Sequence, residues 1–123
     1  RDVAEDAQRD RIYLPLDDLN RWGITEEDIK GGKGILKHPG WGPFVQEYLE
    51  KAELYRERAF KLLPYLDKSS RYSPAAMASF YQSIMRKIIK NDGDVFSNRI
   101  QLSKTEKMFL AAYVYVRFRF IGL

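Results

Sequence analysis

The chain has 123 residues, of which 45% are hydrophobic and 31% charged, a composition that predicts one globular domain with a modest core and excludes a disordered chain. It contains no cysteine, so disulfide bonds and thiolate metal sites are excluded, and it has no apolar run as long as a membrane span. The net charge of +4 comes from 21 basic and 17 acidic residues without a dense basic stripe. This balance suits anionic small molecules or an acidic membrane surface, and makes nucleic acid a poor third choice.

The chain opens on an acidic segment, residues 1–9, which we predict to form the last turns of a helix. In a helix, Asp2 and Asp6 stand one above the other, with Glu5 and Arg9 at the margin of their face. Like charges at this spacing weaken a helix by roughly a few tenths of a kcal/mol. If the two carboxylates share a cation with an anionic ligand, their contribution becomes stabilising. Mg²⁺ suits such a position because one or two carboxylates plus substrate phosphates commonly hold it. A solvated helix face remains the alternative.

Two short helices are predicted after this segment. Pro15 limits the residue before it to an extended conformation. Residues 16–22 are then predicted to form a helix that ends at Gly23. Thr25 caps a further short turn together with Asp28, three residues later.

A glycine-rich segment and a long helix make up the middle of the chain. Residues 31–42 hold five of the eight glycines and are predicted to form a loop. The Gly-Gly-Lys-Gly run in this loop lacks the spacing of a phosphate-binding P-loop. Pro43 suits the first position of a helix. Apolar side chains then recur at helical spacing as far as Leu63, and Pro64 ends the pattern.

Two more helices are predicted in the last part of the chain. Ser73 and Pro74 supply an N-cap and a first-turn proline for one of them. Its apolar stripe, predicted to be buried, consists of Met77, Phe80, Tyr81, Ile84, Met85, Ile88 and Ile89. Ser103 and Glu106 form a capping box for the final segment. Residues 116–120 alternate like a strand, but the capping box and the lack of a second strand candidate favour a helix. The predicted fold class is therefore all-α.

The opening string resembles a motif of a known enzyme family. Arg-Asp-Val-x-Glu-Asp-x-x-x-x-Arg-Ile-Tyr-Leu-Pro, over residues 1–15, is similar to the second aspartate-rich motif of the squalene/phytoene synthase family. Leu19 and the turn over residues 23–28 continue the similarity, which extends in weaker form almost to the C-terminus. The Ile-Tyr-Leu-Pro ending resembles bacterial-type carotenoid and hopanoid members more than eukaryotic squalene synthases.

The resemblance implies a fold, here a partial isoprenoid-synthase-type helical bundle, and a reaction. Members of this family carry out Mg²⁺-dependent head-to-head condensation of two prenyl diphosphates, farnesyl or geranylgeranyl. The reaction passes through presqualene or prephytoene diphosphate to squalene- or phytoene-type products, with NADPH as a further cofactor where the product is squalene. Diphosphate leaves only if metal and cationic side chains stabilise its growing negative charge in a dry pocket.

The resemblance also implies roles for individual residues. Asp2 and Asp6 match the metal-binding aspartates of the second motif, so Mg²⁺ is the expected cofactor. Arg1, Arg11 and Arg99 match positions that bind substrate diphosphate, whose oxygens the planar guanidinium group can bind in a bidentate way. The alternatives are a helix-face ion pair for Arg1 and a surface salt bridge for Arg99.

Aromatic side chains in the last two predicted helices have two possible roles each. Tyr81 falls where family members place a cavity-facing tyrosine, which makes it the candidate catalytic residue, with core packing as the alternative. Near the C-terminus, aromatic residues alternate with Arg117 and Arg119, and this cluster is predicted either to pack in the core or to touch a membrane where long isoprenoid products leave. The aromatic residues are Tyr113, Tyr115, Phe118 and Phe120. We expect a cytoplasmic protein, with peripheral membrane contact as the open question.

The chain departs from the family pattern at its start. The first aspartate-rich motif belongs upstream, and the repeated spacing at Asp6 and Asp10 is expected only to extend the same helix. We therefore interpret residues 1–123 as the C-terminal part of one all-α prenyl-diphosphate synthase domain, inactive by itself, with an exposed helix face that favours self-association. The rivals are a non-catalytic family member acting as a scaffold or assembly factor, and a plain helical interaction domain. Scaffold relatives tend to lose the metal aspartates, which this chain keeps.

Overall fold

The structure is a computed structural model that describes residues 1–120, and this part of the chain contains helices and no strand. The α-helices are α1 (Val3–Gln8), α2 (Leu16–Arg21), α3 (Glu26–Lys30), α4 (Trp41–Phe60), α5 (Tyr72–Lys90) and α6 (Lys104–Phe120). The short 3-10 helices are η1 (Gly32–Lys37), η2 (Leu63–Tyr65) and η3 (Lys68–Ser70). The predicted all-α class is confirmed. Within residues 1–120, none of the helices combines the length and the apolar character needed to span a bilayer.

The chain divides into two compact units. Unit 1 comprises Arg1–Glu50 and Arg86–Gln101, and unit 2 comprises Lys51–Met85 and Leu102–Leu123. The long helices α4 and α5 each contribute to both units. Each unit has buried apolar side chains of its own.

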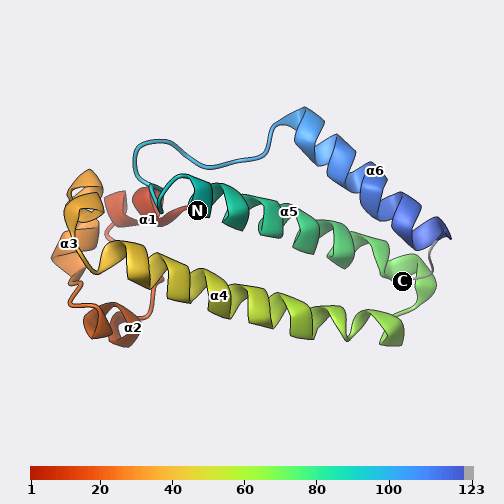
Figure 1. Cartoon of the computed structure of the whole chain (residues 1–123), viewed down its shortest axis with the longest axis horizontal. Coiled ribbons are helices and arrows are strands. Elements are labelled where there is room, and N and C mark those ends of the chain that lie inside the picture. The colour runs from red at the N-terminus through yellow and green to blue at the C-terminus, as the bar shows by residue number, and fades with distance from the viewer. Residues whose placement is uncertain (121–123) are drawn as a thin grey trace. The chain divides into compact units, whose positions relative to one another are not determined.

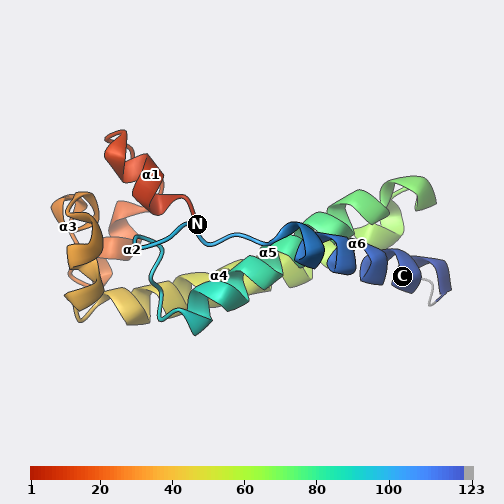
Figure 2. The same cartoon turned by 90° about the horizontal axis from the view of Figure 1, so that it is seen from above.

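In unit 1, the short helices α1, α2 and α3 gather near the N-terminal end of α4 (Figures 1 and 2). Local signals fix their ends. Gly23, with φ of +70°, follows α2 in a Schellman motif, in which the Ile24 amide donates to the Leu19 carbonyl oxygen at 3.1 Å. Leu19 and Ile24 are both fully buried, as the hydrophobic contact of this motif requires. Thr25 and Asp28 form the predicted capping box of α3.

Trp41 lies at the centre of the packing in unit 1. Its buried indole Nε1 donates to the Gly93 carbonyl oxygen at 3.1 Å, and its ring centroid lies 5.7 Å from those of Phe44 and Phe96. Gly93 follows Asp92 in the turn that ends α5, and both residues have positive φ. The buried apolar residues of unit 1 are Leu19, Ile24, Ile29, Ile35, Trp41, Phe44, Ile88, Val95 and Ile100.

Gly40, just before α4, has no room for a side chain. A Cβ atom there would clash with the backbone carbonyl oxygen of Trp22, whereas a Cβ atom on Gly34 of η1 would meet nothing within 4 Å. We expect Gly40→Ala to lower the free energy of unfolding by about 2 kcal/mol, because backbone must move. Gly34→Ala should be neutral or stabilising by up to about 1 kcal/mol. Urea unfolding followed by circular dichroism measures both, and equal losses would contradict the clash at Gly40.

In unit 2, α6 runs antiparallel to the first part of α5 (Figure 1). The Tyr72 hydroxyl donates to the Ala111 carbonyl oxygen at 3.1 Å, and its ring meets that of Tyr115 edge-on at 6.2 Å. Ser103 and Glu106 form the predicted capping box, which settles the final segment as a helix as far as Phe120. A small core consists of Leu63, Ala75, Ala76 and Val114, with Phe60, Tyr72 and Phe118 packed against it.

Several helix boundaries differ from the predictions. α4 begins at Trp41, two residues before Pro43, and ends at Phe60. α5 begins at Tyr72, two residues before Pro74. A proline fits anywhere in the first turn, where backbone N–H groups have no partner within the helix, so it marks the beginning of a helix only approximately. The glycine-rich segment predicted as a loop contains η1.

The apolar stripe of α5 is buried only in part. Ile84 and Ile88 are buried, as predicted, but the side chains of Met77, Tyr81 and Ile89 are more than half exposed. The prediction of a fully buried stripe is therefore wrong for these three residues. Helical periodicity identifies one face of a helix, but the elements packed against that face decide how much of it is covered.

Candidate active site

α1 places the two predicted metal-binding aspartates one helical turn apart. The Asp6 backbone N–H donates to the Asp2 carbonyl oxygen at 2.9 Å, so the two residues are successive positions on one helix face. Both line a pocket of about 220 Å³ in unit 1. Other residues that line this pocket include Arg1, Arg11, Tyr13, Ile29 and Tyr48.

α1 ends at Gln8, and Asp10, two residues later, has the left-handed conformation with φ of 57°. The Arg11 amide donates to the Asp6 carbonyl oxygen at 2.9 Å, and the Asp10 amide to the Ala7 carbonyl oxygen at 3.0 Å, which makes a Schellman motif. The Asp10 carboxylate pairs with Lys30 of α3 at 2.6 Å. The expectation that Asp10 extends the helix is wrong, because the chain turns at this residue.

Two guanidinium groups hold the Asp2 carboxylate. Arg1 donates to its two oxygens from Nε at 3.0 Å and from Nη2 at 2.9 Å, and Arg99 Nη2 donates to Oδ1 at 3.1 Å. Arg99 Nη1 also pairs with Glu5 Oε1 at 3.2 Å. The hydrogen bond from Arg1 is the main cause that lowers the pKa of Asp2 below its usual range, and the charge of Arg99 adds to it. Both arginines are thus joined by ion pairs to the acidic residues of α1 and its N-cap.

The Asp6 carboxylate has a different environment. It is partly buried and lines the pocket, and no hydrogen bond or ion pair to its side chain exists within residues 1–120. The oxygens of Asp6 are therefore available to a cation, whereas those of Asp2 already accept hydrogen bonds from guanidinium groups.

The donor set fits Mg²⁺ as an ion shared with a ligand. Mg²⁺ prefers oxygen ligands in octahedral geometry and usually keeps water or takes phosphate oxygens as further ligands. In the part of the chain that the structure describes, no group of three or more histidine, cysteine or acidic side chains could hold a metal alone. Two carboxylates one turn apart suit a metal whose other ligands are phosphate oxygens and water.

The other predicted site residues are placed as follows. Arg11 is exposed and lines the pocket. Arg99 is joined to α1 through its ion pairs with Asp2 and Glu5. Tyr81 lies on α5 in unit 2, where it is 54% exposed, so it does not take the core-packed position that was its alternative role. The catalytic role of Tyr81 and the diphosphate-binding roles of the arginines stay predictions.

Two pocket residues that come from helices after the opening motif were not predicted from the sequence. Ile29 of α3 and Tyr48 of α4 line the pocket beside the aspartates. The Tyr48 ring stacks on Phe44, with centroids 5.5 Å apart, which fixes one wall. The one sequence signal for Tyr48 is that it lies four residues after Phe44 on the apolar face of α4. Such spacing predicts that the two rings pack together, but it does not predict a pocket.

Replacing Arg99 with glutamine is expected to raise the pKa of Asp2 towards its usual value, because one of its two cations is lost. Because the pKa of Asp2 is lower in the folded state than in the unfolded state, its ionised carboxylate stabilises the fold at pH values above the unfolded pKa of about 3.9. That contribution disappears as the pH falls through the folded value. Since the side chains of Asp2 and Arg99 are 37% and 50% exposed, it stays below about 1 kcal/mol. Carboxyl-carbon NMR titration measures the shift, with Asp10 as the unaffected reference; an unmoved Asp2 pKa would contradict the contact.

Comparisons with known proteins identify the relatives of this chain. The family model described as squalene/phytoene synthase matches residues 1–106. "Phytoene synthase 2, chloroplastic" of Zea mays is 39% identical over 95% of this chain, which covers 28% of that relative. The protein of the same name from Oryza sativa subsp. japonica is 38% identical over 95% of this chain, which covers 29% of that relative. "Phytoene synthase, chloroplastic" of Cucumis melo is 37% identical over 95% of this chain, which covers 27% of that relative.

The chain spans less than a third of the length of these relatives. No solved structure matches it significantly. The family match covers most of the chain and includes α1 through α5, with the aspartates, Arg11 and Arg99. The chain belongs to the squalene/phytoene synthase family.

Proposed function

We propose that this chain supplies the second aspartate-rich half of a metal–diphosphate site in a prenyltransferase that joins two prenyl diphosphates head to head. The observation that carries the proposal is that Asp2 and Asp6 line one pocket together with Arg1 and Arg11, while Arg99 is held on Asp2. Carboxylates can hold a metal ion and guanidinium groups can hold phosphate oxygens, so a site with both suits a diphosphate that binds together with a metal ion. Membership of the squalene/phytoene synthase family supports the same function.

The two aspartates have unequal tasks in this proposal. Asp6 would hold the ion with oxygens that accept no hydrogen bond within residues 1–120, and Asp2 would hold it if Arg1 and Arg99 donate to phosphate oxygens instead. Mg²⁺, when bound, neutralises charge on the carboxylates and on the departing diphosphate. Arg1, Arg11 and Arg99 bind diphosphate oxygens, and their forked donors match that geometry.

The reaction begins when the carbon–oxygen bond of one prenyl diphosphate breaks and diphosphate leaves with the electron pair. The double bond of the second prenyl diphosphate attacks the allylic carbocation, and loss of one proton closes the cyclopropane ring. Arginine side chains stabilise the negative charge as it develops, which is the main demand of such a step. Aromatic ring faces stabilise such a carbocation and help to exclude water, and this is the role that the family resemblance implies for Tyr81.

We infer that geranylgeranyl diphosphate is the substrate and that the product is of the phytoene type. The support is the similarity to proteins named phytoene synthase, at 33–39% identity over 95% of the chain. A phytoene-type product needs no reduction by NADPH, which the squalene-type route requires.

Product identification with the whole protein that carries this chain tests the proposal. With Mg²⁺ and geranylgeranyl diphosphate we expect a head-to-head product, and with farnesyl diphosphate a slower reaction. Residues 1–123 alone should form no product. If the whole protein neither binds nor converts either diphosphate, the proposal is wrong and the scaffold alternative holds. A faster reaction with farnesyl diphosphate would contradict the substrate assignment alone.

A further inference from the structure

The two units of the chain differ strongly in charge. By sequence, unit 2 holds ten lysine and arginine residues against four aspartate and glutamate residues, a net charge of +6. Unit 1 holds eleven basic and thirteen acidic residues, a net charge of −2. The overall charge of +4 conceals this difference. Unit 2 is therefore the part of the chain that attracts anionic surfaces and ligands.

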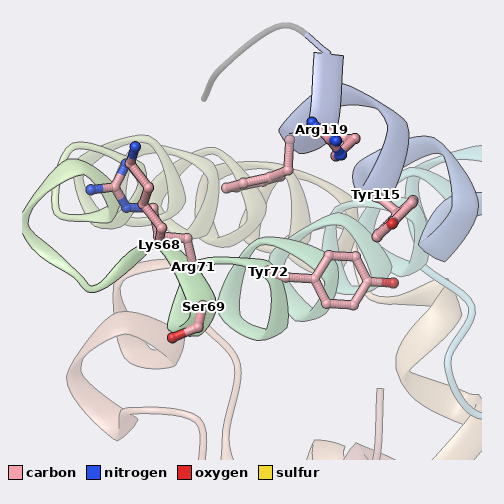
Figure 3. Close-up of a pocket in the computed structure, with 7 residues that line it drawn as sticks. Lys68, Ser69, Arg71, Tyr72, Tyr115 and Arg119 are labelled. Carbon is pink, nitrogen blue, oxygen red and sulfur yellow. The ribbon is translucent and has the colours of Figure 1, made fainter.

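Unit 2 contains a pocket of about 820 Å³ where basic and aromatic side chains meet (Figure 3). One side comes from the segment that leads into α5, and the other from the last turns of α6. The basic and aromatic residues that line it include Lys68, Arg71, Tyr72, Tyr115 and Arg119. Among the residues that the structure describes, no acidic side chain lines this pocket. Three cations thus share one concave surface with an aromatic wall.

Arg71 is held in place by the backbone. Its Nε donates to the Leu66 carbonyl oxygen at 2.8 Å and its Nη2 to the Pro64 carbonyl oxygen at 2.7 Å. A guanidinium group has five N–H donors, so these bonds orient it and leave further donors for a phosphate group. The aromatic wall is also fixed, because the Tyr72 hydroxyl bonds to the Ala111 carbonyl oxygen. Arg71 and Tyr72 are therefore preorganised and need little ordering on binding.

Exposed aromatic side chains lie close in sequence to the basic residues of the pocket. Tyr65, three residues before Lys68, is 87% exposed, and Phe120, next to Arg119, is 77% exposed. Aromatic rings with neighbouring lysine or arginine are typical of surfaces that lie in the headgroup layer of a membrane. A free phosphate ion makes no contact with such rings. A lipid surface, in contrast, can bind the basic side chains at its headgroups and the aromatic rings in its interfacial layer.

We propose that this pocket binds the phosphate of an anionic phospholipid headgroup, with Tyr65 and Phe120 entering the interfacial layer. This inference goes beyond the proposed reaction and does not depend on the aspartate site. It places a membrane-binding surface on the segment before α5 and the end of α6.

Co-sedimentation of the full 123-residue chain with vesicles tests the proposal. We compare phosphatidylcholine vesicles with vesicles that contain about one third phosphatidylglycerol, at low salt. Binding should require phosphatidylglycerol. The double variant Lys68→Gln/Arg119→Gln should weaken binding about 20-fold. The matched variant Lys104→Gln/Lys107→Gln removes two exposed cations of the same unit outside the pocket, and should weaken it less than about threefold.

Equal losses for both double variants would overturn the proposal, because they would show attraction by net charge alone. Equal binding of the chain to both kinds of vesicle would also overturn it. Inorganic phosphate at matched ionic strength should not release the chain from vesicles; release would assign the pocket to free phosphate instead. Circular dichroism of each variant checks that the helices are intact, and Tyr65→Ser, an exposed change, should weaken vesicle binding without disturbing the fold.

Discussion

Replacing Asp6 with asparagine is expected to lower kcat/KM of the whole protein for prenyl diphosphate by about 10²- to 10³-fold. Asp6 is the pocket carboxylate whose oxygens make no hydrogen bond or ion pair within the described chain. It can therefore approach a divalent ion without first losing a partner. The asparagine side chain keeps nearly the same shape but removes the negative charge that Mg²⁺ requires. Steady-state kinetics over a range of Mg²⁺ concentrations measures the loss, which excess Mg²⁺ should restore only in part.

Asp10→Asn is the matched control for this experiment. Asp10 also lies four residues from Asp6, carries the same charge and belongs to the same segment. Its carboxylate pairs with Lys30, however, and does not line the pocket. Asparagine tolerates the left-handed conformation of this position, so the fold should persist. The loss of one exposed ion pair should change kcat/KM less than about fivefold. Equal losses for Asp6→Asn and Asp10→Asn would refute the special role of Asp6.

Replacing Trp41 with alanine is expected to lower the free energy of unfolding of the chain by about 3–5 kcal/mol. The Trp41 ring is buried against Phe44 and Phe96 and bonds to the backbone at Gly93. Its removal leaves a cavity and a buried carbonyl oxygen without its indole donor. Urea unfolding of unit 1, followed by near-ultraviolet circular dichroism, measures the loss.

A pair of tryptophan-to-phenylalanine variants separates burial from hydrogen bonding. Trp41→Phe keeps most of the apolar contact but removes the donor to a buried carbonyl, which should cost about 1–3 kcal/mol. Trp22 also donates its Nε1 proton, to Glu47 at 2.8 Å, but it is 36% exposed. Trp22→Phe should therefore cost less than about 1 kcal/mol, because water replaces the lost partner. Equal costs would show that burial is not what makes Trp41 important.

The parts of the fold that sequence could predict are those decided within a few residues. Gly23 ends α2, Thr25 opens α3 and Ser103 opens α6, and in each case the bonds that matter join residues no more than five apart. The beginnings of α4 and α5 were less predictable, since Pro43 and Pro74 fit several positions of a first turn. Exposure at Met77 depends on which elements pack against α5, which a helical pattern does not reveal.

The candidate site divides in the same way. The spacing of Asp2 and Asp6 is local, and their shared pocket agrees with it. The Arg99 contact with Asp2 spans 97 positions in sequence and was not predicted, since the family resemblance implied only that Arg99 binds diphosphate, with a surface salt bridge as the alternative. Its second contact, with Glu5, was not predicted. The basic pocket of unit 2 could not be predicted from the sequence, because its cations come from two segments that are far apart in the chain.

The most direct test of the central claim is calorimetric binding of a non-hydrolysable prenyl diphosphate to the whole protein, with and without Mg²⁺. For the unaltered protein we expect binding that Mg²⁺ strengthens by at least about 100-fold, because the ion joins carboxylates and diphosphate. In the double variant Asp2→Asn/Asp6→Asn this dependence on Mg²⁺ should disappear. If the double variant binds the diphosphate with the same Mg²⁺ dependence as the unaltered protein, the two aspartates of α1 do not hold the metal.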